Sequence, residues 1–370
     1  MSLPVHLTDR EIEDFGRELD DIYEEVMNDR GEADARYIRR VIKTQRWLAA
    51  VGRVGIFASL ALLPEWGHAL ASWWAFGAAM AFGVLSLGLA KILENMEIGH
   101  NVMHAQWDWL RDPEINSGSW EWDSVCPSDQ WKHSHNVMHH TWTNVIGRDR
   151  DVGYGILRVN AAQPWHPKYV PQMLYNMLLA VFFEWGVALH DVEFDRIVTG
   201  DKKLSEAMPL MRGILRKIAR QGAKDYILWP LLAGPFFLYV AGANAVANLI
   251  RNLWSYAIIF CGHFPEGSQV FTETDVEGET RARWYLRQLL GSCNIEGGPL
   301  FHVLSGNLSH QIEHHLFPDM PSNRYPQVAP RVRALCDRYG LPYNSGSLAR
   351  QFGTTTWAIA RHSLPSAKAA

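Results

Sequence analysis

The stretch Trp66–Ala90, WGHALASWWAFGAAMAFGVLSLGLA, decides the fold class of this chain because its 25 residues include no Asp, Glu, Lys or Arg. About 20 consecutive apolar residues are enough for a helix to cross the hydrocarbon core of a membrane. A second uncharged run extends from Tyr226 to Ile250. The mean hydropathy of the whole chain is only −0.14, since the charges gather outside these runs. The sequence therefore predicts an all-α integral membrane protein.

The residues before the first apolar run predict how the chain is oriented. Residues 8–46 are expected to be helical, because apolar side chains recur there at helical spacing. Four cations end this segment: Arg39, Arg40, Lys43 and Arg46. Lys and Arg are enriched on the cytoplasmic side of membrane helices. Residues 1–46 are therefore predicted to be a cytoplasmic N-terminal helical arm.

Five apolar segments are candidates for membrane crossings. The first two lie near 47–64 and 69–92, and Arg53 in the former must extend its side chain toward the surface. The other three candidates are 169–190, 226–241 and 243–262. Histidine-rich segments precede and follow these three. If those histidines share one site, the number of crossings between them must be even, and one of the three segments does not span.

Charges inside these segments leave two candidates for the segment that does not span. Glu184 interrupts one segment and Arg251 another, so either could lie at the interface. Four crossings in all are predicted, with residues 265–370 contributing to a cytoplasmic helical cap. Residues 47–345 would form the membrane domain, and 346–370 a C-terminal tail.

Histidines carry the strongest functional signal in the sequence. Nine of the sixteen fall into three short windows: His100 and His104; His133, His135, His139 and His140; and His310, His314 and His315. Residues four apart share one face of a helix, so each window presents a pair of imidazoles. The doubled His140 and His315 are turned by about 100° and can reach a second metal ion. This pattern predicts two metal ions held close together.

The type of ligand narrows the choice of metal. Imidazole suits zinc, copper, iron and nickel alike. A closed structural zinc site needs only four ligands, and the H-E-x-x-H pattern of zinc proteases is absent. Eight or more imidazoles beside a bilayer favour two irons that bind and cleave O₂. A non-catalytic membrane zinc receptor or transporter is the alternative from another class of protein.

The three windows resemble the histidine boxes of the membrane fatty acid desaturase family, written H-x(3)-H, H-x(3)-H-H and Q-x-x-H-H. Gly306–Pro318 (GNLSHQIEHHLFP) is especially similar to the third box, and His139–Asn144 (HHTWTN) to the second. Ala90–Asn101 (AKILENMEIGHN) and Ile259–Pro265 (IFCGHFP) resemble a bacterial branch that desaturates stearoyl-CoA at position 9 with electrons from NADPH. The resemblance covers residues 35–360.

The resemblance implies a helical mushroom with four crossings and a cytoplasmic cap over a di-iron site. It carries the family's metal ligands onto eight positions: His100, His104, His135, His139, His140, His263, His314 and His315. Gln311 replaces the first histidine of the third box and is expected just behind the ligands, while His310 is an additional ligand candidate. His133 is expected at the surface or behind the ligands. Ile259 departs from the family pattern, because some members have Asn at this position.

Carboxylates near the boxes are candidates to orient the ligand rings, since metal-bound imidazoles normally donate their second N–H to a carboxylate or a carbonyl. Glu97 lies on the stripe predicted for His100 and His104, and the alternative is that it only marks the membrane exit. Asp149 and Asp151 follow the second box and are candidates for the same role.

A regular basic stripe precedes the second uncharged run. It consists of four cations at intervals of four residues: Arg212, Arg216, Arg220 and Lys224. One interpretation is a solvated face that lies on anionic lipid headgroups. The other is that some of these cations hold the phosphates of a CoA thioester.

Missing motifs indicate how electrons arrive. The sequence has no His-Pro-Gly-Gly haem motif, no G-x-G-x-x-G and no P-loop. Two electrons must then come from a separate electron-transfer protein, which the resemblance pairs with an NADPH-dependent reductase. The expected reaction is O₂-dependent desaturation of a long-chain acyl-CoA, stearoyl-CoA at position 9, to a cis-monounsaturated product. A front-end (linoleoyl-type) desaturase and a di-iron membrane hydroxylase are the alternatives.

Composition adds two expectations about surroundings. No basic tract typical of nucleic-acid binding is present, so no nucleic-acid partner is expected. The four cysteines lie far apart, which fits reduced residues of a cytosol-facing protein. We expect an integral protein of the bacterial plasma membrane, in contact with lipid and with its histidine boxes facing the cytoplasm.

Overall fold

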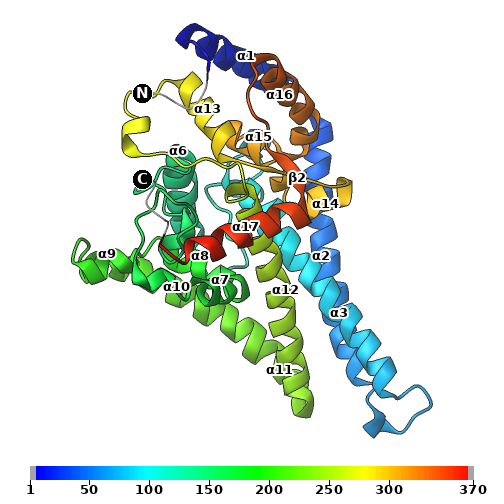
Figure 1. The fold of residues 1–370 in the computed structure, drawn as a ribbon. Coiled ribbons are helices and arrows are strands. Elements are labelled where there is room, and N and C mark those ends of the chain that lie inside the picture. The colour runs from blue at the N-terminus through cyan, green and yellow to red at the C-terminus, as the bar shows by residue number, and fades with distance from the viewer. Residues whose placement is uncertain (1–5, 366–370) are drawn as a thin grey trace.

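The computed structural model describes residues 6–365, which are almost entirely helical (Figure 1). The α-helices are α1 (Asp9–Asn28), α2 (Glu32–Leu60), α3 (Trp73–Leu93), α4 (Asn101–Met103), α5 (Ser128–Trp131), α6 (His140–Trp142), α7 (Gln172–Val181), α8 (Phe183–His190), α9 (Phe194–Thr199), α10 (Leu204–Gly222), α11 (Trp229–Leu231), α12 (Phe237–His263), α13 (Arg281–Gly291), α14 (Pro299–Leu304), α15 (Gln311–Leu316), α16 (Tyr325–Tyr339) and α17 (Leu348–His362). Three π-helical segments are η2 (Glu94–His100), η4 (Lys132–His139) and η7 (Ala223–Leu228). Two short strands, β1 (Asn294–Glu296) and β2 (Ser345–Ser347), pair in parallel.

Short 3₁₀ segments join the longer elements. They are η1 (Pro64–Trp66), η3 (Asp108–Leu110), η5 (Gly153–Gly155), η6 (Pro167–Tyr169), η8 (Gly234–Phe236), η9 (Glu273–Asp275), η10 (Leu308–His310) and η11 (Ser322–Arg324). The all-α expectation is confirmed apart from the two three-residue strands. The outermost residues of the predicted arm and tail, 1–5 and 366–370, lie outside the described residues.

The predicted helix over residues 8–46 is in fact two helices. Thr8 caps α1, since its side chain accepts a hydrogen bond from the Glu11 backbone N–H at 3.3 Å. The chain then breaks at Gly31, which has an extended conformation and begins α2. From there α2 continues without interruption through residue 46 to Leu60, so the arm and the first apolar segment share one helix.

The helices α2 and α3 form a hairpin that projects from the rest of the molecule (Figure 1). Glycines allow their backbones to touch. A Cβ on Gly52 would lie 2.7 Å from the Leu87 nitrogen, and one on Gly83 would lie 2.6 Å from the Ile56 nitrogen. Small residues permit this close approach in membrane helix pairs. The hairpin therefore depends on these glycines.

A second hairpin is formed by the continuous helical path α10–η7–α11 and by α12, and its tip points in the same direction as the first (Figure 1). The chain reverses at residues 232–236, where Gly234 has a φ of 55° and is followed by Pro235. The sequence prediction of separate apolar segments at 226–241 and 243–262 is wrong. One helix covers Phe237–His263, since the isolated Gly242 between the two predicted segments is tolerated inside it.

Length and apolarity support fewer crossings than the sequence predicted. Within residues 6–365, one continuous helical stretch, Trp73–Met103, is long and apolar enough to cross a membrane. The pair α7 and α8 would count as a second only as a broken span, since it bends by 100°. The long helix α12 fails the same criterion because Arg251 and several Asn residues lower its hydropathy.

The opposite end of the molecule is a helical cap. Helices α1, α13, α15 and α16 pack around one hydrophobic core that includes Phe15, Tyr285, Phe317 and Val332. The helix α17, which the sequence assigned to a tail, packs through Ile359 on a core shared with α8 and α12. Its buried face makes it part of the folded body.

Candidate metal centre

The three histidine windows lie at helix ends that converge between the hairpins and the cap. His100 ends the π-helical segment η2, and His139 ends η4. His314 and His315 lie in α15, while His263 is the last residue of α12. A π-helix has i→i+5 hydrogen bonds and is frequently found at functional sites. The extra residue in each turn shifts the side chains away from the regular α-helical faces assumed from the sequence.

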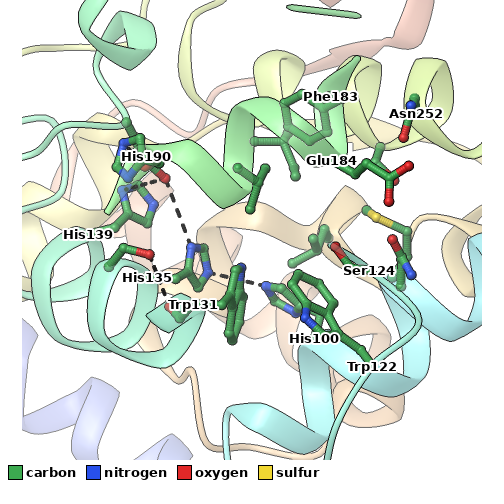
Figure 2. A pocket seen from close by; sticks show the side chains of 18 of the residues that line it. His100, Trp122, Ser124, Trp131, His135, His139, Phe183, Glu184, His190 and Asn252 are labelled. Atoms are coloured by element: carbon green, nitrogen blue, oxygen red, sulfur yellow. Dashed lines mark hydrogen bonds and ion pairs between the residues drawn. The ribbon is translucent and has the colours of Figure 1, made fainter. Parts of the chain in front are cut away.

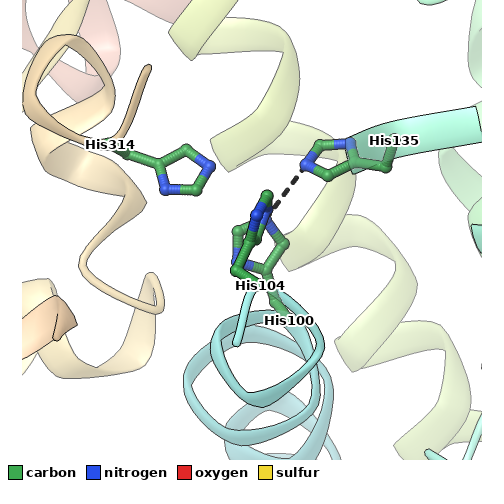
Figure 3. A group of neighbouring side chains, drawn as sticks. All are labelled: His100, His104, His135 and His314. Atoms are coloured by element: carbon green, nitrogen blue, oxygen red, sulfur yellow. Dashed lines mark hydrogen bonds between the residues drawn. The ribbon is translucent and has the colours of Figure 1, made fainter. Parts of the chain in front are cut away.

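The first group of ligand candidates consists of His100, His104, His135 and His314. Each offers a ring nitrogen, and these nitrogens lie within 4.8 Å of one another. His100 and His104 come from one helix, while His135 and His314 approach from separate elements (Figure 3). The Nε2 atoms of His100 and His135 are only 3.3 Å apart. This is a four-imidazole site.

The second group consists of His139, His263 and His315, whose nitrogens also lie within 4.8 Å of one another. His140 forms a further group with His314 and His315, which places it between the two sites. The rings of His140 and His315 are stacked with centroids 4.4 Å apart. All eight histidines predicted as ligands therefore lie in one continuous cluster.

The hydrogen bonding of this cluster fits bound metal ions. In the described part of the chain, several buried ring nitrogens have no hydrogen-bond partner: Nε2 of His104, His139, His314 and His315, Nδ1 of His263 and both nitrogens of His140. Buried polar atoms are normally satisfied, so such a concentration needs an explanation. Metal coordination would supply a partner for one nitrogen of each ring.

The other nitrogen of these rings is held by the protein. Nδ1 of His139 lies 3.0 Å from the Asp149 carboxylate, and Nδ1 of His315 lies 2.9 Å from the Gln288 side-chain oxygen. Nδ1 of His314 is 3.3 Å from the Tyr325 hydroxyl. Such partners fix the orientation of metal-binding imidazoles. The cluster therefore has one held and one free nitrogen on each of these rings.

Electrostatics keep most of the rings neutral and able to bind metal. Burial, followed by neighbouring imidazoles, lowers the pKa of five of them well below the usual value: His104, His135, His140, His314 and His315. Burial also disfavours the charged form of His139, but Asp149 and Asp151 outweigh it and raise the pKa of His139 to about 9. His139 is the ring whose charge the protein compensates.

Two outer candidates lie away from both groups. His310 stacks on His302 with ring centroids 4.5 Å apart and belongs to neither group. Burial, and then His302, lowers the pKa of His310 to about 4. His133 is exposed, and its Nδ1 lies 2.9 Å from Asp191.

Contrary to the sequence prediction, Glu97 does not hold a ligand ring. Its carboxylate accepts hydrogen bonds from Tyr37 at 3.0 Å, Ser322 at 2.6 Å and Asn307 at 3.0 Å, and these partners join α2 to the cap. Nδ1 of His100 instead lies 3.0 Å from the Asn101 side chain. The predicted stripe assumed a regular α-helix, whereas the π-turn rotates Glu97 away from the histidines.

Gln311 lies beside the second group, with its amide 2.9 Å from Nε2 of His263. Among the described residues, its other amide atom is buried without a partner. The residue that replaces a histidine in the third box therefore points at the centre.

His190 was not predicted to belong to the site. Its Nε2 lies 3.1 Å from Asp151, and that carboxylate also lies 3.5 Å from Nδ1 of His139. Asp151 forms a further potential metal group with His135 and His139. His190 lies far from the boxes in sequence, and no local pattern marks it.

A cavity borders the centre (Figure 2). Its wall includes four candidate ligands: His100, His135, His139 and His263. Apolar side chains provide much of the remaining surface, including Met96, Trp131, Phe183, Val187, Ile259 and Leu308. Trp131 stacks on His135 with centroids 4.4 Å apart. An apolar molecule in this cavity would lie against both metal groups.

Comparison with known proteins decides the family. Residues 71–347 match the family model for fatty acid desaturases. The chain belongs to the fatty acid desaturase family. The NADPH-dependent stearoyl-CoA 9-desaturase of Mycobacterium tuberculosis is 49% identical over 364 residues, which cover 97% of this chain and 82% of that protein. The predicted family is therefore confirmed.

More distant members of the family also match. The sn-1 linoleoyl-lipid 6-desaturase of Synechocystis is 26% identical over 267 residues, 70% of this chain and 74% of that protein. An acyl-lipid (7-3)-desaturase of Rebecca salina is 28% identical over 58% of this chain and 48% of that protein. The chain is an oxidoreductase of lipid metabolism, and its family is associated with membranes.

Proposed function

We propose that this chain desaturates stearoyl-CoA at position 9 to the cis-monounsaturated acyl-CoA, with O₂ and two external electrons. The observation that carries this proposal is the 49% identity, over 97% of the chain, to an NADPH-dependent stearoyl-CoA 9-desaturase. The balanced reaction takes one O₂, two electrons and two protons, and it releases two waters. Both hydrogens removed from the adjacent methylenes leave in these waters.

Two iron ions are the cofactors in this proposal. One would be held by His100, His104, His135 and His314, the other by His139, His263 and His315, with His140 between them. Bound iron supplies the activation of O₂. A histidine-rich donor set without thiolates is compatible with iron. His310 stays outside the proposed ligand set because it belongs to neither group.

The protein's own residues would bind and orient the acyl chain. Phe183, Val187 and Ile259 would contact its methylenes and exclude water from the histidine wall. Asp149 would keep Nε2 of His139 directed at its metal by holding Nδ1. In this family the cofactor supplies the chemistry, and the protein supplies position and surroundings.

Electrons would come from an electron-transfer protein served by an NADPH-dependent reductase. The relative named above is NADPH-dependent, whereas the present sequence has no G-x-G-x-x-G pattern. Purified chain with NADPH, O₂ and stearoyl-CoA alone should give no product. Addition of the reductase and its electron carrier should restore turnover, and turnover without them would contradict this part of the proposal.

We further propose four crossings of the bacterial plasma membrane, two in each hairpin, with the cap and the histidine centre in the cytoplasm. The hairpin tips point in one direction, away from the cap (Figure 1). The proposed domain organisation is a cytoplasmic arm at 1–46, continuous through α2 with a membrane desaturase domain at 47–345, followed by α17, which packs on that domain. Reporter tags after residues 125 and 280 should both indicate the cytoplasm, and a tag at residue 68 the opposite side.

The decisive experiment identifies the product. The chain, reconstituted with reductase and NADPH, should convert stearoyl-CoA to an 18-carbon product with a cis double bond at position 9, as judged by gas chromatography–mass spectrometry. A front-end activity is the second candidate, because of Gln311 and the similarity to a linoleoyl-lipid 6-desaturase. Conversion of linoleoyl lipid but not of stearoyl-CoA would replace the first proposal with the second.

A further inference from the structure

The cavity beside the metal centre has a charged end. Figure 2 shows His139 and His190 at one end of the cavity and Glu184 with Asn252 at the other. Glu184 forms an ion pair there with Arg251 of α12, and both side chains line the cavity. They are almost completely buried, with exposed fractions of 7% and 1%. An isolated ion pair in an apolar cavity is costly and needs support from neighbouring groups.

The ion pair is held from behind. Gln221 donates a hydrogen bond to the second Glu184 oxygen at 3.1 Å. The Arg251 guanidinium donates to the Asp123 carbonyl at 3.2 Å and to the Asn252 side chain at 3.2 Å. Asn252 is fixed in turn by the Val181 carbonyl at 2.9 Å. These bonds prevent either charged group from turning aside to extend the cavity.

The polar surface continues around the pair. The Ser255 hydroxyl and the Asn95 amide nitrogen also belong to cavity-lining residues, and both are buried without a partner in the described part of the chain. A solvent-facing groove shares Ser134 and His190 with the cavity, on the side away from Glu184, and we place the entrance of the acyl chain there. An acyl chain that enters there would pass the histidines before its methyl end reaches Glu184 and Arg251.

We infer that the Glu184–Arg251 pair is the floor of the acyl cavity and sets the maximum length of the chain beyond the metal centre. This inference rests on the proposed function. A methyl group can stop at the floor without cost, but further methylenes would have to separate hydrogen-bonded charges and leave them buried. The pair therefore acts as a specificity determinant for chain length. The double-bond position is counted from the thioester end and does not depend on it.

The test is a competition between acyl-CoA substrates of 18 and 20 carbons in one reaction. The double variant Glu184→Ala/Arg251→Ala removes both charges together and deepens the floor. The ratio of 20-carbon to 18-carbon product should rise on the order of tenfold, the preference expected for burying two more methylenes. The double bond should stay at the same position. Because a ratio is measured within one preparation, it does not depend on protein yield.

A second variant keeps the ion pair intact and should shift the preference toward shorter acyl chains. Ser255→Leu adds bulk at the same end, so it should lower the ratio of 18-carbon to 16-carbon product. This variant decides the question if the double variant fails to fold. The matched control replaces another ion pair, that of the buried Asp34 with the partly buried Arg324, which joins α2 to the cap at 2.6 Å and does not line the cavity. Asp34→Asn/Arg324→Gln should leave both ratios unchanged.

The outcomes distinguish a failure of the proposed function from a failure of the floor assignment. If the wild-type chain converts no saturated acyl-CoA, the proposed function fails. If the wild type is active and an iron-containing variant keeps the wild-type length ratio, only the floor assignment is wrong. A moved double bond with an unchanged length ratio would also overturn it, because the chain would then be positioned by its methyl end.

Discussion

Two polar regions lie wholly or partly inside this molecule, and they differ in how their polar atoms are satisfied. One is the histidine cluster, in which many ring nitrogens have no protein partner within residues 6–365. The other is a charge network of Arg53, Lys91, Asp123 and Asp225. In that network Asp225 binds Arg53 and Lys91, each at 3.0 Å, and Lys91 reaches Asp123 at 3.2 Å.

The difference separates a structural role from a ligand-binding one. The charge network joins α2, α3 and η7, and its charges compensate one another. Its removal should affect folding but not metal binding. The histidine cluster is more deeply buried than the charge network, in which the Asp123 side chain is 32% exposed, yet its hydrogen bonding is incomplete, so it needs a ligand. If this distinction holds, substitutions in the charge network should lower stability, and substitutions in the histidine cluster should lower metal binding.

The largest effect is expected from loss of His140, whose two ring nitrogens are both buried without a partner and which lies between the two groups. His140→Ala should lower activity by more than about 100-fold, beyond the range typical for loss of an outer partner, and it should release metal. Elemental analysis and product formation in the same membranes measure both. The exposed His133→Ala is the matched control and should keep wild-type metal content.

Breaking the charge network should reduce stability instead. Asp225→Ala leaves Lys91 and Arg53 partly uncompensated, and removal of one partner from a buried ion pair costs about 3–5 kcal/mol. Thermal unfolding in detergent measures the loss. The double variant Lys91→Met/Asp225→Leu should unfold at a higher temperature than the single one. In each case the metal content of the folded fraction should remain normal, and a metal-free folded fraction would contradict the distinction.

An intermediate effect is expected at Asp149, which belongs to the support of the histidine cluster. Asp149→Asn keeps the shape but weakens the hold on Nδ1 of His139. Loss of such a partner typically reduces metal affinity or activity by roughly 10–100-fold. Titration with a chelator should release metal from this variant first. A wild-type chelator profile would show that His139 needs no such support.

Glu97 should behave like a member of the charge network, because protein groups satisfy its carboxylate. In Glu97→Gln an amide group faces the hydroxyl and amide donors of Tyr37, Ser322 and Asn307, and an unsatisfied buried group costs about 1–3 kcal/mol. The unfolding temperature should fall while metal affinity stays at the wild-type value. Preferential metal loss would restore the role that the sequence suggested.

The smallest effect is expected at His310. It lies in the third box but stacks on His302, outside both groups. His310→Ala should change metal content by less than about twofold, comparable to the small effect of most substitutions away from special features. Loss of one metal ion per chain would place His310 among the ligands.

Features encoded within a short segment of the sequence were predicted correctly. The uncharged run from Trp66 to Ala90 and the histidine spacings lie within short segments, so composition and periodicity were enough to predict helices and a metal cluster. Local rules failed where the helix itself was irregular. The π-turn at Glu94–His100 moved Glu97, and no residue type marks such a turn in the sequence.

Contacts between distant segments were decided only by the tertiary structure. The division of eight histidines into groups depends on how α12, α15 and the two π-helical segments converge, and His135 and His314 of one group are far apart in the chain. His190 reached Asp151, and Glu184 met Arg251, for the same reason. The sequence alone determined apolar helices and a histidine cluster, because those properties follow from composition and short spacings, while the resemblance of its three histidine windows to the desaturase boxes pointed to the family. Which nitrogens share a metal, and where the cavity ends, depend on packing across helices.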